Sequence, residues 1–209
     1  LRIMSNFTNI LGKDDDYFDL SNQVKESFNM QYDQLYDVID KKDQTIRPNQ
    51  IFLVSLDYSM INQPLQEEII KNIESKLITP FGLRTLNPEH PDYKGNYIGM
   101  HNRDIAYHNG TVWPWLLGPF VHSFIRLKKY EQYWRTYAYE HFLKTMFDAF
   151  GDQWDGSIHE IFDGSPPYIP RGCITQAWSV AEILRCLVED IENIRPPFEK
   201  MVLSSKIRA

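Results

Sequence analysis

Hydrophobic residues recur along much of this chain at the spacing of an α-helix. The clearest stripe consists of four aliphatic residues at four-residue steps, with Glu and Lys on the opposite side: Leu65, Ile69, Ile73 and Leu77. Such a stripe is typical of a helix that packs one face on a core. Asn62 fits a capping residue and Pro64 a first-turn proline, while the Thr-Pro-Phe-Gly sequence at 79–82 ends the pattern. We therefore predict a helix that starts at about residue 62 and ends before residue 79.

Less regular stripes predict five further helices. Their expected ranges are about 15–30, 49–58, 111–129, 130–150 and 173–191. In the 111–129 segment, Gly118 and Pro119 fall inside an apolar run. Because a proline removes one backbone hydrogen bond and clashes with the carbonyl four residues back, we expect that helix to be kinked or to start late.

The spacing also predicts which faces of the last two helices are buried. In 130–150 the stripe is largely aromatic and comprises Trp134, Tyr137, Ala138, Phe142, Met146, Phe147 and Phe150. In 173–191 it comprises Ile174, Ala177, Trp178, Ala181, Leu184 and Val188. We expect both stripes to face the hydrophobic core rather than a cofactor.

Two long stretches without a helical period separate these segments. Residues 79–110 are rich in Gly, Pro, Asn and Tyr, and residues 151–172 are punctuated by Gly and Pro. Loops of this length in a compact domain are more often functional than idle. Because almost no stretch alternates between apolar and polar residues as a strand does, the sequence predicts an all-α fold with two long functional loops.

Composition narrows the possible partners and location. The 209 residues are 43% hydrophobic, enough for one domain with a substantial core. The formal net charge of −6 provides no basic surface for phosphates, so we expect no nucleic-acid partner. No apolar run is long enough for a membrane span and no leader pattern is present, so we expect a soluble, cytoplasmic protein. Cys173 and Cys186, placed in one helix about 20 Å apart, are expected to be reduced packing residues.

Two polar and aromatic motifs each precede an apolar helical segment. The first motif, residues 107–120, reads YHNGTVWPWLLGPF. The second motif comprises residues 156–164, GSIHEIFDG, and their continuation at 170–179, PRGCITQAWS. Each is a Gly-containing loop that carries polar and aromatic side chains, so we expect the two motifs to line one pocket.

These motifs, together with IRPNQ at 46–50, resemble the C-terminal part of microbial glycogen debranching enzymes, in particular their amylo-α-1,6-glucosidase domain. The resemblance covers about residues 15–190. It implies an (α/α)6 toroid in which long loops gather around a sugar pocket at one end. Six helices make about half of such a ring, so the resemblance implies that residues 1–194 are the C-terminal half of the domain and 195–209 a tail.

The resemblance also assigns a catalytic carboxylate. Inverting glycosidases use one carboxylic acid to protonate the leaving oxygen and one carboxylate to activate water. Glu160 matches the family's general base by its motif. The acid of the family lies in a Trp-Met-Asp type motif that this sequence lacks, and neither Asp104 nor Asp163 matches its position. We therefore leave the acid unassigned and expect the isolated chain to be inactive.

The candidate sugar-binding residues are rings that can stack on a sugar and polar groups that can bond its hydroxyls. They are Tyr107, Trp113 and Trp115, with His108, Asn109, Arg47, Asn49 and Gln176. The sequence contains no cluster at metal-ligand spacing and no phosphate-binding glycine motif, so we expect neither a metal nor another cofactor.

The sequence thus predicts hydrolysis of α-1,6-linked glucose at glycogen branch points by an inverting mechanism. Two alternatives stay open: an (α/α)6 glucosidase of other linkage, or a non-catalytic module that binds glucan or packs against a partner. Half a ring leaves an apolar face open. We therefore expect two kinds of partner. One is a branched α-glucan. The other, which would cover the open face, is either the rest of the parent catalytic domain or a second copy of the chain.

Overall fold

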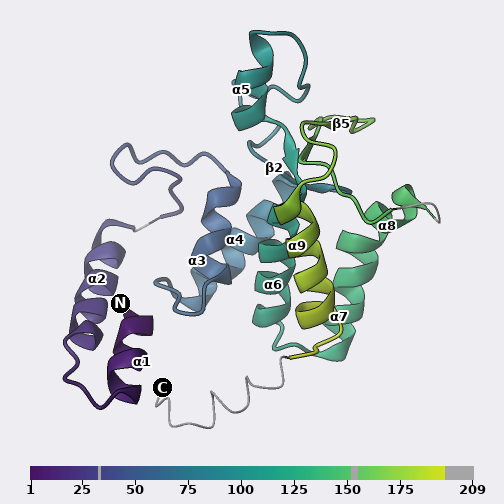
Figure 1. Cartoon of the computed structure of the whole chain (residues 1–209). Helices are drawn as coiled ribbons and strands as arrows, with labels where there is room; N and C mark the ends of the chain where they lie inside the picture. The colour runs from purple at the N-terminus through teal and green to yellow at the C-terminus, as the bar shows by residue number, and fades with distance from the viewer. Residues whose placement is uncertain (33, 152–154, 196–209) are drawn as a thin grey trace.

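A computed structural model of the chain describes residues 1–32, 34–151 and 155–195, and they are mainly helical (Figure 1). The α-helices are α1 (Arg2–Ile10), α2 (Tyr17–Gln31), α3 (Phe52–Ser55), α4 (Gln63–Lys76), α5 (Asn102–Asn109), α6 (Leu117–Leu127), α7 (Gln132–Ala138), α8 (Lys144–Phe150) and α9 (Ala177–Arg185). Two 3₁₀ turns, η1 (Pro48–Ile51) and η2 (Pro114–Leu116), precede α3 and α6. Two π-helical turns, η3 (Tyr139–Leu143) and η4 (Cys186–Ile191), follow α7 and α9.

The predicted capping of α4 is confirmed. The Asn62 side chain accepts a hydrogen bond from the backbone N–H of Leu65 at 3.1 Å, and Pro64 lies in the first turn. Ile69 and Ile73 are fully buried in the core. The helix ends at Lys76, as its sequence pattern predicts, before the chain enters a short strand.

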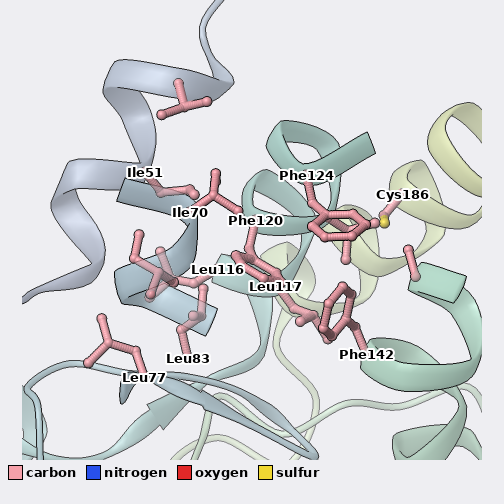
Figure 2. Packing of buried hydrophobic residues seen from close by; sticks show 14 of the residues in the cluster. Ile51, Ile70, Leu77, Leu83, Leu116, Leu117, Phe120, Phe124, Phe142 and Cys186 are labelled. Atoms are coloured by element: carbon pink, nitrogen blue, oxygen red, sulfur yellow. The ribbon is translucent and has the colours of Figure 1, made fainter. Parts of the chain in front are cut away.

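The delayed start predicted for the proline-containing helix is also confirmed. The 3₁₀ turn η2 comes first, so Pro119 falls in the first turn of α6. Backbone N–H groups in the first turn have no hydrogen-bond partner within the helix, so the absence of an N–H on proline costs nothing there. Phe120 and Phe124 then point from α6 into the core and meet Phe142 edge to face, at ring-centroid distances of 5.0 and 5.2 Å (Figure 2). These rings join α6 to the π turn η3.

The helix expected at 130–150 is present as α7, η3 and α8 in succession. It starts at Gln132 because Lys129 and Tyr130 have positive φ values, which end the preceding helix. Of the predicted stripe, Ala138, Phe142 and Met146 are buried, and its remaining members are partly buried against the same core. This stripe is therefore part of the core, as predicted.

The predicted core face of the last helix is wrong. Ile174 and Leu184 are 70% and 58% exposed. The helix starts at Ala177 rather than Cys173, and α9 and η4 instead bury a face on α6 that carries two polar residues: Ser179, Ile183, Cys186 and Asp190. The hydrophobic pattern favoured the opposite face, because an aspartate such as Asp190 is expected in solvent unless cationic partners are known to pair with it.

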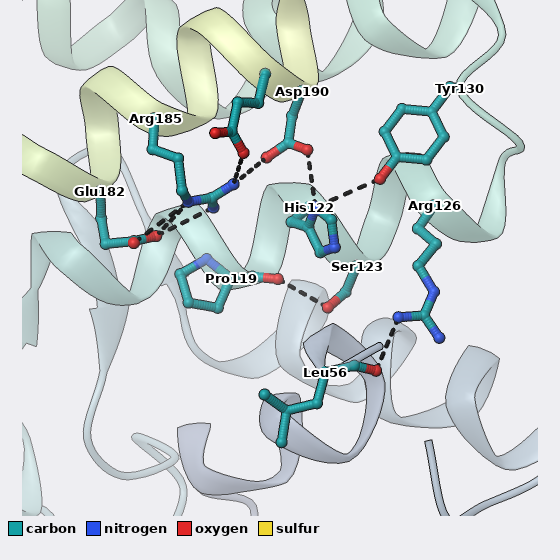
Figure 3. A network of polar contacts seen from close by, with 10 residues as sticks. Leu56, Pro119, His122, Ser123, Arg126, Tyr130, Glu182, Arg185 and Asp190 are labelled. Atoms are coloured by element: carbon teal, nitrogen blue, oxygen red, sulfur yellow. Dashed lines mark hydrogen bonds and ion pairs between the residues drawn. The ribbon is translucent and has the colours of Figure 1, made fainter. Parts of the chain in front are cut away.

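Those partners form a buried polar network between α6 and α9–η4 (Figure 3). The Asp190 carboxylate accepts from Arg185 Nη1 at 3.1 Å and lies 2.8 Å from His122 Nδ1. Arg185 also bonds the Glu182 carboxylate, and the Tyr130 hydroxyl lies 3.4 Å from the same His122 nitrogen. Pairing of this kind is what allows a carboxylate to be fully buried.

The all-α prediction needs a correction, because the chain contains a small antiparallel sheet. Its strands, in the order β1-β2-β3-β4-β5, are β1 (Ile78–Thr79), β2 (Gly82–Arg84), β3 (Val112–Trp113), β4 (Ile161–Phe162) and β5 (Pro170–Arg171). Strands of two or three residues are too short to show the alternation that identifies a strand in a sequence. The segment 79–110, predicted as loop, therefore contributes β2 and also the helix α5.

The chain is thus mainly helical with a small sheet, and the toroid stays a prediction. Most of the expected C-terminal tail, residues 196–209, lies outside the described residues. The two cysteines are free but not in one helix: Cys173 is exposed ahead of α9, while Cys186 is buried in η4, where burial raises the pKa of its thiol. No helix in the described part of the chain is long and apolar enough to cross a membrane.

Candidate functional site

The small sheet brings the two motifs together. Val112 of the first motif pairs with Phe162 of the second, and Ile161 pairs with Arg171 in the continuation. In Figure 1, α5 and the β4–β5 loop lie at the same end of the helix stack. A helix that ends at Asn109 and a strand that begins at Ile161 therefore deliver Tyr107 and Glu160 to one place.

Both oxygens of the Glu160 carboxylate are held by the protein. The Tyr107 hydroxyl donates a hydrogen bond to Oε1 at 2.5 Å, and the Cys173 backbone N–H donates to Oε2 at 2.9 Å. The Glu160 backbone N–H in turn donates to the Cys173 carbonyl at 2.9 Å. The side chain is half-buried, and among the described residues it forms no ion pair. Glu160 is therefore an oriented carboxylate without a neutralising cation.

Gly172 allows the backbone to approach this carboxylate. Its φ is +67°, a left-handed conformation that favours glycine. A Cβ atom at this position would lie 2.6 Å from Glu160 Oε2 and 3.0 Å from Glu160 Cβ. A side chain at residue 172 would therefore push Glu160 out of its place.

We expect Gly172→Ala to lower the free energy of unfolding by about 2 kcal/mol, because it adds a steric contact with Glu160 to the strain of a positive φ. Gly156→Ala is a matched control: Gly156 also has a positive φ, of +86°, but a Cβ there meets nothing within 4 Å. Urea denaturation of both variants measures the difference. Equal destabilisation would show that the contact with Glu160 does not matter.

An aromatic group lies beside the carboxylate. The Tyr107 ring meets Trp113 edge to face at 4.7 Å and His108 at 5.2 Å. Trp178 continues the group, because it lies 5.8 Å from Trp113 and stacks on Trp115 at 5.7 Å. The structure thus brings together four of the predicted site residues and adds Trp178, which the sequence analysis placed in the core. The sequence signal for Trp178 as a site residue is its position in the second motif, two residues after Gln176. Its 45% exposure in the structure agrees with that position.

Arg47 ties the 46–50 segment to the first motif. Its Nη1 donates to the carbonyls of Thr85 and His108, at 3.0 and 2.8 Å, and its Nη2 donates to Asn109 Oδ1 at 2.8 Å. The Asp37 carboxylate lies 3.6 Å from its Nε. The guanidinium is therefore occupied by the protein and positions the residues that follow Tyr107.

The other two polar candidates lie at the margins of this group. Asn49 is exposed, and its amide donates to the Asp37 carboxylate at 3.1 Å. Gln176 is half-buried at the N-terminus of α9, where its backbone N–H donates to the Ile158 carbonyl at 2.9 Å. Gln176 thus joins α9 to the loop that carries Glu160.

Neither nearby aspartate supplies a second free carboxyl group. Asp163 is buried, accepts from the backbone N–H of Tyr97 at 2.8 Å, and pairs with Arg171 at 3.0 Å. The Asp104 side chain is 82% exposed and lies 3.8 Å from Arg103. Within the described residues there is also no group of three or more His, Cys, Asp or Glu that could hold a metal ion. The site therefore contains one oriented carboxylate and a group of neighbouring aromatic side chains.

One comparison with known protein families bears on this site. The model of the family described as amylo-alpha-1,6-glucosidase matches residues 1–185. The matched range contains Glu160, both motifs and the whole of α9.

Proposed function

Because the chain belongs to the amylo-alpha-1,6-glucosidase family, a family of glycosidase-type debranching domains, we propose that it supplies the general-base half of a catalytic site that removes α-1,6-linked glucose at glycogen branch points with inversion. The observation that carries this proposal is the Glu160 carboxylate, which is held on both oxygens and bonded to Tyr107, whose ring meets Trp113. An oriented carboxylate next to rings suits the activation of water beside a sugar.

In the proposed reaction Glu160 takes a proton from a water molecule while that water attacks the anomeric carbon of the terminal glucose. A carboxylic acid on the opposite face of the sugar gives a proton to the departing oxygen, and the bond to that oxygen breaks. Asp163 forms an ion pair with Arg171, and Asp104 faces solvent. We therefore place the acid on helices that complete the ring, outside this chain.

The rings and polar groups of the site would hold the sugar. Trp113 would offer a ring for stacking, and His108 and Asn109 would offer hydrogen bonds to hydroxyls. Trp115 stacks on Trp178 and on Phe52, so it would support the site from behind. Gln176 lies on the same side as the Glu160 loop. For Arg47 and Asn49 we propose a supporting role beside substrate binding, because their donors are already bonded to protein groups.

An exposed apolar surface on α9, η4 and the segment before α9 suggests where a partner would bind. Its exposed residues are Ile174, Trp178, Leu184 and Val188. We propose that the rest of the parent catalytic domain covers this face and that a second copy of the chain can replace it in the isolated protein. A helical face of this kind is seldom left in water. The cytoplasmic location stays a prediction.

The experiment that tests the proposed function uses this chain together with the helices that complete the ring, called here the complete domain. We expect the complete domain to release glucose from branched limit dextrin, with β-glucose as the first anomer seen by proton NMR. This chain alone should be inactive, because loss of a positioned acid lowers the rate by about 10²–10⁴-fold. Early α-glucose would contradict inversion, and dextrin binding without glucose release would favour a non-catalytic glucan-binding module.

A further inference from the structure

The hydroxyl of Tyr107 has a different environment from the ring that carries it. The hydroxyl reaches Glu160 Oε1 at 2.5 Å, the length of a strong hydrogen bond to a charged acceptor. The half-buried ring contacts Trp113, His108 and Tyr97, the last at 6.0 Å. A side chain that served only to stack on sugar would not need a fixed partner for its hydroxyl.

The backbone at Tyr107 is fixed as well. Its carbonyl accepts from Thr111 Oγ1 at 3.0 Å and from the indole N–H of Trp113 at 3.4 Å. Arg47 binds the next carbonyl along the chain, that of His108. The position of the Tyr107 hydroxyl is therefore set by the first motif, while the carboxylate it meets belongs to the second.

The direction of this hydrogen bond follows from the protonation of the phenol. Burial raises the pKa of Tyr107 well above its ordinary value, and the hydrogen bond and charge of Glu160 raise it further. The phenol therefore stays protonated and donates to Glu160. Together with the Cys173 N–H this uses one lone-pair direction on each carboxylate oxygen and leaves the others for water.

We infer that Tyr107 is a positioning residue for the general base: its hydroxyl, paired with the Cys173 amide, holds the Glu160 carboxylate in a single orientation. This inference rests on the proposed function. It assigns to Tyr107 a role through Glu160 in place of the sugar stacking expected from the sequence. It also explains why the two motifs must meet, since each supplies one half of the pair.

The test is Tyr107→Phe in the complete domain, with limit dextrin as substrate. The ring stays, so KM should remain within about threefold, while loss of a hydrogen bond to a charged group should lower kcat by about 10- to 100-fold. Tyr97→Phe removes the hydroxyl of a neighbouring ring, which in the described part of the chain forms no hydrogen bond with Glu160, and should leave both kcat and KM unchanged.

A double-mutant cycle separates this inference from the function on which it rests. If Tyr107 acts through Glu160, the variant with both Tyr107→Phe and Glu160→Gln should be no slower than Glu160→Gln alone. Additive losses or an effect confined to KM would overturn the positioning role. An active Glu160→Gln variant would instead overturn the proposed base. Thermal melts matched to those of Tyr97→Phe show that the variants are folded.

Discussion

Glucose release by the complete domain is expected to fall at least about 10²-fold when Glu160 is replaced by Gln, because the variant loses the carboxylate that takes the proton from water. Gln keeps the length of the side chain and can still accept from the Tyr107 hydroxyl through its amide oxygen. The binding of oligosaccharides should therefore survive. Initial rates on limit dextrin and calorimetric binding of a branched oligosaccharide measure the two effects separately.

The matched control for this substitution is Glu192→Gln. Glu192 is exposed just after η4, so its replacement changes the same charge without touching the site. We expect wild-type rates from it. If Glu160→Gln left glucose release within a few-fold of wild type, Glu160 would not be the general base.

The second large effect is expected on stability, at Asp190. Its carboxylate is fully buried and serves two cationic or donating partners, Arg185 and His122 (Figure 3). Asp190→Ala leaves the Arg185 charge beside the core with part of its pairing gone, and breaking a buried pair in this way lowers the free energy of unfolding by about 3–5 kcal/mol. Chemical denaturation monitored by circular dichroism measures the loss.

Glu189→Ala is a close control, because Glu189 contacts the same guanidinium from the position just before Asp190. Its side chain is 32% exposed and lies 3.4 Å from Arg185 Nη1. Partly exposed ion pairs contribute about 0–1 kcal/mol, so this variant should be nearly as stable as wild type. Equal losses from the two variants would mean that burial of Asp190 adds nothing to its pairing.

The helices could be predicted where a long stripe and its end signals agree. In α4 the stripe, the Asn62 cap and the following turn sequence indicate the same boundaries, and the structure confirms them. The same method failed for α9, because the buried face contains Ser179 and Asp190 and the exposed face contains Leu184. A hydrophobic pattern cannot anticipate that a carboxylate is paired across two helices.

The sheet and the details of the site depend on contacts that no local pattern reveals. Strands of two residues, such as β3 and β4, are defined by partners far along the chain. The motifs identified Glu160 and Tyr107, but only the structure shows the hydrogen bond between them. Trp178 was misassigned for the same reason, since its contacts with Trp113 and Trp115 come from other segments.

The sheet also has a consequence for how the molecule folds. Helices such as α4 join residues close in sequence and can form early, whereas Val112 must find Phe162, and Arg84 Nε must find the Gly164 carbonyl 80 residues away. Closing such long segments is entropically unfavourable until both partners are in place. Tyr107 and Glu160 lie next to these strands in the sequence, so the two motifs should assemble last, as one cooperative unit on the helical core.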